Sequence, residues 1–184
     1  MRYEQTIVVA ATRAEAAHVP RHLPVVVTGL GKTAAAVATT RALAGVDPAR
    51  TLVVNIGTAG ALRDGLEGLH LPGTTINHDM NADAIRALGY DPEERLVVEG
   101  GDDTVLASGD VFVTDPAVRD ALADRAHLVD MEGYAVAFAC RRMGVPVRLL
   151  KHVSDNADES ALDWPAVVDA SARALGAWLE EHVS

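Results

Sequence analysis

Short apolar runs alternate with helical patterns along most of this chain. The apolar runs are rich in β-branched residues, which is typical of strands. Predicted strands lie within residues 6–11, 24–28, 51–56, 71–79, 104–108, 128–130 and 145–150. Helical patterns cover residues 12–17, 33–44, 115–126, 134–143 and 165–182, and residues 81–89 are interpreted as a short helix or a mobile segment. Strands that alternate with helices in this way predict an α/β fold with one domain.

Composition narrows the class of protein. The chain has 184 residues, of which 49% are hydrophobic, and this is enough for one well-packed domain. A formal net charge of −10, with basic residues scattered along the chain, argues against nucleic acid and anionic membranes as partners. One cysteine, Cys140, excludes an internal disulfide and fits a reducing compartment. We see no signal peptide and no apolar run long enough to span a bilayer, so a cytoplasmic protein is expected.

Polar or glycine-rich sequences follow several of the predicted strands. In α/β proteins, ligands bind outside the carboxyl ends of parallel strands. The four sequences of this kind are Gly57 to Gly60, Ser108 to Val113, Met131 to Gly133, and Ser154 with Asp155. The first of them is interpreted as a turn whose glycines let the backbone approach a ligand. No cluster of His, Cys, Asp and Glu has convincing metal-ligand spacing, so neither a metal nor a cofactor is expected.

Each of these features also has a purely structural interpretation. Ser154 and Asp155 are typical helix N-caps, and Glu15 suits the first turn of a helix because a carboxylate there interacts with the helix dipole. Gly29 to Thr33 is similar to a phosphate-binding loop, but Val26 occupies a position where that loop requires glycine.

Five motifs, taken in order, resemble those of the purine nucleoside phosphorylase and nucleosidase family. The strongest likeness is to the methylthioadenosine/S-adenosylhomocysteine nucleosidases. The motifs are Gly29-Leu30-Gly31-Lys32, Asn55 to Gly60, Ser108 to Phe112, Met131-Glu132 and Ser154 to Asp158. The resemblance covers nearly the whole chain and implies a three-layer fold, in which helices flank a central, mostly parallel or mixed sheet. It also implies a segment shorter than usual between Glu15 and Gly29.

The resemblance implies hydrolysis of the N-glycosidic bond of a purine nucleoside, with adenine as the expected base. Asp155 matches the family's general acid, which gives a proton to the departing base. Burial can raise the pKa of such a carboxyl group so that it carries that proton. Glu15 matches the group that activates the attacking water, as the second carboxylate does in inverting glycosidases.

Further positions match the family's substrate contacts. Glu132 matches the residue that holds the ribose hydroxyls, because a carboxylate accepts two hydrogen bonds from a diol. Phe112 matches a ring that packs on the purine, and Val113 a residue whose backbone meets the purine edge. The remaining matched contacts are Leu30, Thr58, Gly60, Met131 and Ser154.

The resemblance also suggests a homodimer, in which residues 81–90 line a neighbour's pocket for the 5′ substituent. The family's larger side chains around that substituent are smaller or aliphatic here, at Thr12, Leu88 and Leu162, and Arg86 lies beside them. The sequence therefore leaves the 5′ group open.

Two alternatives remain. The first is a phosphorylase of the same family, which uses phosphate as the nucleophile. Hexameric phosphorylases carry an arginine where this chain has Asn55, and the loss of that cation favours water. The second alternative is a non-catalytic module that binds nucleosides. The presence of Glu15, Glu132 and Asp155 together argues against it.

Overall fold

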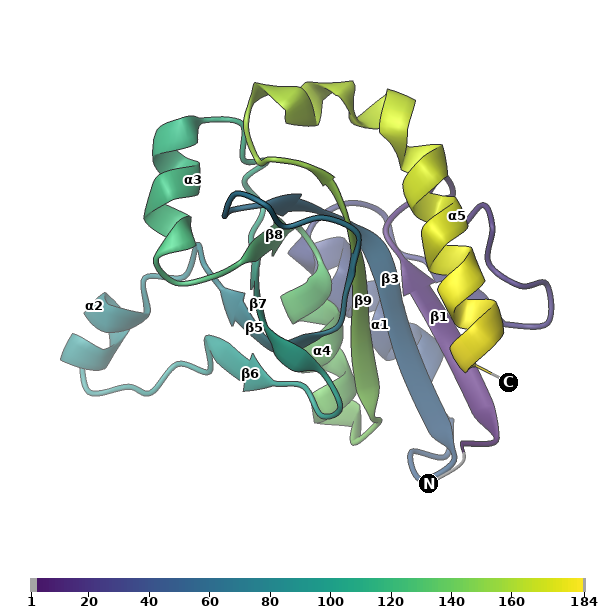
Figure 1. Ribbon diagram of the computed structural model, residues 1–184. Helices are drawn as coiled ribbons and strands as arrows, with labels where there is room; N and C mark the ends of the chain where they lie inside the picture. Colours follow the sequence, from purple (N-terminus) through teal and green to yellow (C-terminus); the bar gives the residue numbers. More distant parts are fainter. Residues whose placement is uncertain (1–2, 184) are drawn as a thin grey trace.

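The computed structural model describes residues 3–183, and its centre is a nine-stranded mixed sheet (Figure 1). The strands are β1 (Gln5–Ala10), β2 (Val25–Val27), β3 (Thr51–Ala61), β4 (Leu69–His70), β5 (Pro72–Asn77), β6 (Arg95–Val97), β7 (Asp102–Ser108), β8 (Leu128–Asp130) and β9 (Val147–Asp155). The helices are α1 (Lys32–Leu43), α2 (Ala82–Ala87), α3 (Pro116–Ala123), α4 (Gly133–Met143) and α5 (Trp164–His182), and a 3₁₀ turn, η1 (Glu159–Asp163), precedes α5.

The long strand β3 connects the parts of the sheet. It runs parallel to β1 on one side and to β9 on the other, and its last two residues pair antiparallel with β8. The strands then continue in the order β8, β7, β5 and β6, and the pairs between β8, β7 and β5 are parallel. The carboxyl ends of β3 and β9 lie side by side, and so do those of β7 and β8; because β8 has only three residues and pairs with the end of β3, all four ends lie in one region.

Helices cover both faces of the sheet, which gives three layers. Figure 1 shows α5 in front of the sheet, with α1 and α4 behind it. Alternate residues of a strand point to opposite faces, and β1 follows this rule. Val8 and Ala10 pack with Leu175 and Leu179 of α5, and the intervening residues of β1 pack with α1 and α4. The predicted three-layer α/β fold is confirmed.

The predicted turn at Gly57 to Ala61 is wrong, because these residues continue β3. β9 pairs with them as far as Gly60, so the stretch is part of the sheet, whereas the N–H of Thr58 donates to the side chain of Glu15. The glycine at position 57 has a packing reason instead. A Cβ atom there would lie 3.1 Å from Glu15 Oε1 and 3.2 Å from Lys151 Nζ.

The last predicted strand is longer than expected, because β9 runs on through Ser154 and Asp155. The interpretation of these two residues as a helix N-cap is therefore wrong. Asp158 has that function instead, since its side chain accepts a hydrogen bond from the backbone N–H of Ser160 at the start of η1. The polar pair is thus held in the sheet, at the carboxyl end of its strand.

The predicted helix at residues 12–17 is absent, and this segment forms a series of turns. The backbone N–H and the hydroxyl of Thr12 both donate to the Glu15 carboxylate, so local side-chain bonds replace helical ones. Glu15 is therefore no partner of a helix dipole. Residues 81–89 contain the short helix α2, capped by Asn81, and β4 and β6 are strands that the sequence did not predict. Across residues 3–183, no helix is long and apolar enough to cross a membrane.

Candidate active site

All ten residues that the sequence predicts for the site line one cavity of about 420 Å³. The cavity lies at the carboxyl ends of the strands. Its walls come from the turns after β1, the end of β3, the segment after β7, the end of β8, the end of β9, and the start of α5. A volume of this size falls within the range of small-molecule pockets, about 300–1,000 Å³.

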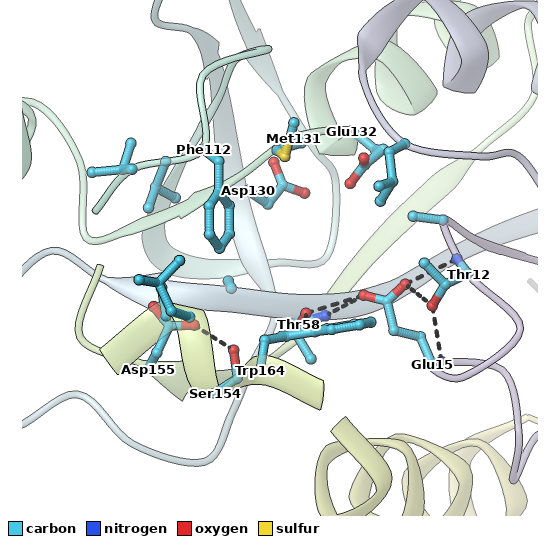
Figure 2. A pocket seen from close by; sticks show the side chains of 18 of the residues that line it. Thr12, Glu15, Thr58, Phe112, Asp130, Met131, Glu132, Ser154, Asp155 and Trp164 are labelled. Carbon is cyan, nitrogen blue, oxygen red and sulfur yellow. Dashed lines mark hydrogen bonds between the residues drawn. The ribbon is translucent and has the colours of Figure 1, made fainter. Parts of the chain in front are cut away.

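Figure 2 shows two facing sides of the cavity. Phe112, Met131 and Glu132 lie on one side, and Asp155 and Glu15 lie on the other. Residues that are up to 140 positions apart in sequence thus face one space, as the resemblance implies for a nucleoside site.

Glu15 is buried and accepts four hydrogen bonds. Its Oε2 accepts from the N–H of Thr12 at 3.0 Å and from the Thr12 hydroxyl at 2.9 Å. Its Oε1 accepts from the N–H of Thr58 at 2.9 Å and from the Thr58 hydroxyl at 3.1 Å. All four contacts come from donors, which matches an ionised carboxylate that can only accept. These four contacts hold the carboxylate in a fixed place beside the cavity.

Glu132 follows β8 and is 8% exposed. Its Oε1 accepts a hydrogen bond of 2.7 Å from the N–H of Gly31, so the glycine turn after β2 orients this carboxyl group. Burial, together with the negative charge of Asp130, raises the pKa of the Glu132 carboxyl to about 7. Glu132 therefore changes its charge near neutral pH.

A buried ion pair lies beneath this side of the cavity. The Nζ of Lys151 is 2.9 Å from Asp130 Oδ2, and both side chains are only 2% exposed. Asp130 also accepts hydrogen bonds from the Ser108 hydroxyl and from the N–H of Gly133. Lys151 is not among the residues that line the cavity. Lys151 therefore offsets the charge of Asp130 from behind the cavity wall and does not face the cavity.

Asp155 is the last residue of β9 and is partly buried. Its Oδ1 accepts from the N–H of Ala157 at 2.8 Å, and its Oδ2 lies 2.7 Å from the Ser154 hydroxyl. A hydroxyl group can donate or accept, so Ser154 is able to pair with either protonation state of Asp155. Gly60 packs against the carboxylate, because a Cβ atom there would lie 2.9 Å from Asp155 Oδ1.

Apolar side chains form the rest of the predicted contacts. Val113 is buried and Met131 is partly buried, whereas Phe112 is 51% exposed and Leu30 is 66% exposed. These two exposed side chains leave apolar surface at the rim of the cavity that a ligand or a second chain could cover. Arg86 does not line the cavity of the same chain, and its guanidinium group forms ion pairs with Asp83 and Glu94.

The acid and base side chains that line the cavity are all carboxyl groups. Among the described residues, its lining includes four carboxyl groups, those of Glu15, Asp130, Glu132 and Asp155, and no lysine, arginine or histidine. Lys32, which follows the glycine turn, donates to Asn77 and Asp79 outside this lining. Within residues 3–183, no group of three or more His, Cys, Asp and Glu side chains is arranged to hold a metal ion.

Sequence reasoning missed what three side chains of the lining do: Thr12 as a partner of Glu15, Asp130 as a partner of Lys151, and Trp164 as a partner of Thr58. Asp130 stands directly before the Met131-Glu132 motif, so its place in the sequence offered a signal. Trp164 is one of only two tryptophans in the chain, but its contact with Thr58 spans 106 residues and left no local pattern.

Comparisons with known proteins agree with the geometry. The sequence pattern of the phosphorylase superfamily matches residues 18–183. An aminodeoxyfutalosine nucleosidase of Helicobacter pylori is 32% identical over 130 residues, which cover 59% of this chain and 56% of that protein. A 5′-methylthioadenosine/S-adenosylhomocysteine nucleosidase of Shewanella oneidensis is 27% identical over 173 residues, which cover 76% of this chain and 70% of that protein.

A solved structure is similar over nearly the full chain. The crystal structure of a Helicobacter pylori 5′-methylthioadenosine/S-adenosylhomocysteine nucleosidase, in complex with a pyrrolidine compound, superimposes with a TM-score of 0.83 at 25% identity. The superposition covers 98% of each chain. By sequence, however, this chain spans little more than half the length of the first relative above. These likenesses support the sequence-based prediction of a nucleosidase.

Proposed function

Because this chain belongs to the phosphorylase superfamily, we propose that it hydrolyses the N-glycosidic bond of a purine nucleoside, releasing the free base and a sugar. The observation that carries the proposal is the charge of the cavity lining: four carboxyl groups and no cation. A phosphate nucleophile would bring about one to two negative charges into this space. Burying such a charge without a cationic partner is costly. Water carries no such charge, and a carboxylate is a suitable base for it.

The substrate that fits this proposal is a 5′-substituted 5′-deoxyadenosine. The names of the relatives include methylthioadenosine, S-adenosylhomocysteine and aminodeoxyfutalosine. Phe112 offers a ring face to the purine, and the backbone of Val113 meets its edge. The carboxyl group of Glu132 accepts hydrogen bonds from the ribose hydroxyls. Leu30, Thr58, Gly60, Met131 and Ser154 complete the contacts.

The reaction needs one proton given and one proton taken. As the bond between the sugar carbon C1′ and the base nitrogen breaks, Asp155 gives a proton to the base. The sugar then has oxocarbenium character. A water molecule adds to C1′ from the opposite side and loses a proton to Glu15. In Figure 2, Asp155 lies at the left and Glu15 at the right of the lower side of the cavity, and they come from the end of β9 and from the turns after β1.

The phosphorylase alternative is weaker. Asn55 occupies the position where the resemblance places an arginine in hexameric phosphorylases. Its side chain is buried in the sheet and donates to the carbonyl oxygen of Val9. It does not line the cavity. A non-catalytic module is weaker still, because binding alone does not require Glu15, Glu132 and Asp155 to line one cavity together.

We also propose that residues 1–184 act as one nucleoside phosphorylase-like domain in a homodimer in the cytoplasm. The segment between Glu15 and Gly29 is short, and it holds only turns and the edge strand β2. Leu30, Phe112 and Leu162 are exposed beside the cavity, and Leu88 and Tyr90 are exposed on the segment around α2. A second copy that places its α2 segment over the rim would cover both sets and would complete the pocket for the 5′ group.

An assay of base release tests the proposed reaction. Purified protein is given adenosine and several 5′-substituted 5′-deoxyadenosines, and free adenine is measured over time. Asp155→Asn should lower kcat by about 10²–10⁴-fold, the usual contribution of a general acid or base. Asp163→Asn is the matched control, because Asp163 is exposed, lies nearby and does not line the cavity. Turnover by Asp155→Asn at the rate of this control would refute the role of Asp155.

A further inference from the structure

Trp164 connects the wall of the cavity to the predicted base. It is the first residue of α5, and its indole Nε1 lies 2.8 Å from the Thr58 hydroxyl oxygen. That hydroxyl lies 3.1 Å from Glu15 Oε1, and the backbone N–H of Thr58 donates to the same oxygen at 2.9 Å. These hydrogen bonds connect Trp164 through Thr58 to Glu15, along the lower side of the cavity in Figure 2.

The chemistry of the indole decides which group donates and which accepts in these hydrogen bonds. An indole N–H can only donate, so the Thr58 oxygen must be the acceptor of that bond. A hydroxyl group has one proton, and a lone pair of Thr58 is already occupied by Trp164. The hydroxyl proton is therefore free to point at Glu15, which as a carboxylate can only accept. Without the indole, the hydroxyl could rotate and donate to another acceptor or to water.

The position of the Glu15 carboxylate depends on its hydrogen bonds with Thr58, because Glu15 lies outside the regular elements of the fold. It belongs to neither a helix nor a strand, and its own segment forms only turns. Its contacts with Thr12 stay within that segment. Its contacts with Thr58 are the ones that tie it to the buried strand β3. Sites need supporting side chains whose rotamers are held in place, and Trp164 supplies this for Thr58.

We propose that Trp164 is a positioning residue for the base. Its N–H fixes the Thr58 hydroxyl as a donor to Glu15 and so holds the Glu15 carboxylate where it meets the attacking water. This inference rests on the proposed hydrolysis. It adds a function for the start of α5: besides forming a wall of the cavity, this turn sets the orientation of Glu15 through the hydroxyl of Thr58.

The test separates the N–H group from the aromatic ring. Trp164→Phe keeps an aromatic wall and removes only the donor, and Thr58→Val removes the hydroxyl at nearly constant volume. Each should lower kcat by roughly 10-fold or more with little change in KM, because small misplacements of reacting groups cost up to about 100-fold. The variant that combines Trp164→Phe and Thr58→Val should be no slower than the worse single variant, because both substitutions remove the same series of hydrogen bonds. Thr58→Ser keeps the hydroxyl and should retain most of the activity.

The second tryptophan provides a matched control. Trp178 lies on α5 away from the cavity, where it stacks on His182 with ring centroids 4.4 Å apart. Trp178→Phe should keep the wild-type kcat, and thermal melting should show that every variant is folded. Wild-type kcat in Trp164→Phe, or a rise in KM alone, would overturn the positioning role and leave the proposed hydrolysis standing. Additive losses in the double variant would also overturn it. Absence of base release by the wild-type protein on all nucleosides would overturn the hydrolysis, and the inference with it.

Discussion

Glu132 shows how the cavity changes the chemistry of a single residue. Its carboxyl group is buried beside Asp130, and these two effects raise its pKa to about 7. Lys151 and the N–H of Gly31 act in the opposite direction, but they are the weaker causes of the shift. At neutral pH the group therefore exists as a mixture of acid and carboxylate.

The raised pKa of Glu132 predicts a pH dependence of stability. The pKa is 4.5 in an unperturbed chain and about 7 in the folded protein, so the folded state binds more protons between these values. This group's contribution to stability is present at low pH and is lost as the pH rises from about 4.5 to about 7. Glu132→Gln removes the titration. We expect urea unfolding at pH 5 and pH 8 to show a larger loss of stability in the wild type than in Glu132→Gln, by about 1.4 kcal/mol for each pH unit between pH 5 and the folded pKa of about 7.

The comparison between the two proteins isolates Glu132 from other titrating groups, such as the histidines, because these are shared. An equal change in the free energy of unfolding for both proteins, between the same two pH values, would contradict the raised pKa.

The site residues differ in how well the sequence could predict them. Glu15, Glu132 and Asp155 stand in motifs at strand ends, and the structure brings all three to one cavity. Their catalytic and binding functions stay predictions. Lys151 and Trp164 act through partners 21 and 106 residues away, so no local pattern could reveal them. A lysine at the end of an apolar run also gives no sign that its charge is buried with Asp130.

At the scale of elements, the predicted turn at residues 57–60 shows why a local interpretation failed. The glycines at positions 57 and 60 were interpreted as a turn, because glycine is depleted in strands. In the structure they lie within β3 and leave room for groups from other elements: Glu15 and Lys151 at the first, Asp155 and Ala157 at the second. Local propensity gave way to packing at the site. The alternation of strands and helices was predicted correctly, because most of these elements carry their own apolar pattern.

Gly60 allows a direct test of this packing. A Cβ atom at this position would lie 2.9 Å from both Asp155 Oδ1 and the Ala157 Cβ atom. Gly60→Ala must therefore push Asp155 and the start of the following loop away from β3. We expect a fall in kcat/KM of at least about 10-fold, because a shift of about 1 Å in a reacting group can cost up to 100-fold.

Two measurements on Gly60→Ala are needed. Base release gives the loss of activity, and thermal melting shows whether the protein remains folded at the assay temperature. A folded Gly60→Ala protein with wild-type kcat/KM would show that the position of Asp155 does not depend on this close contact.

At the scale of the whole molecule, the exposed apolar residues predict a homodimer. Leu88 and Tyr90 are 75% and 71% exposed on the segment around α2, and Leu30 and Phe112 are exposed at the rim of the cavity. Analytical ultracentrifugation should give twice the mass of the 19.3 kDa chain. Leu88→Asp should shift the mass toward the monomer, because it would bury a charge in the interface.

Val97 provides the control for the dimer. It is 76% exposed on β6, at the other edge of the sheet from β1 and β2, and Val97→Asp should leave the mass unchanged. A monomeric wild-type protein that is fully active at the same concentration would contradict the dimer. A Leu88→Asp protein that stays dimeric would instead show that this segment lies outside the interface.

The central claim is that the acidic cavity uses water and not phosphate. The most direct measurement is an analysis of the products formed from an adenine nucleoside, with inorganic phosphate absent and then present at millimolar concentration. The proposed reaction predicts free adenine and free sugar, formed at the same rate in both cases, because no cation lines the described cavity to bind phosphate. Strict dependence on phosphate, with a sugar 1-phosphate as product, would contradict hydrolysis and would make this protein a phosphorylase.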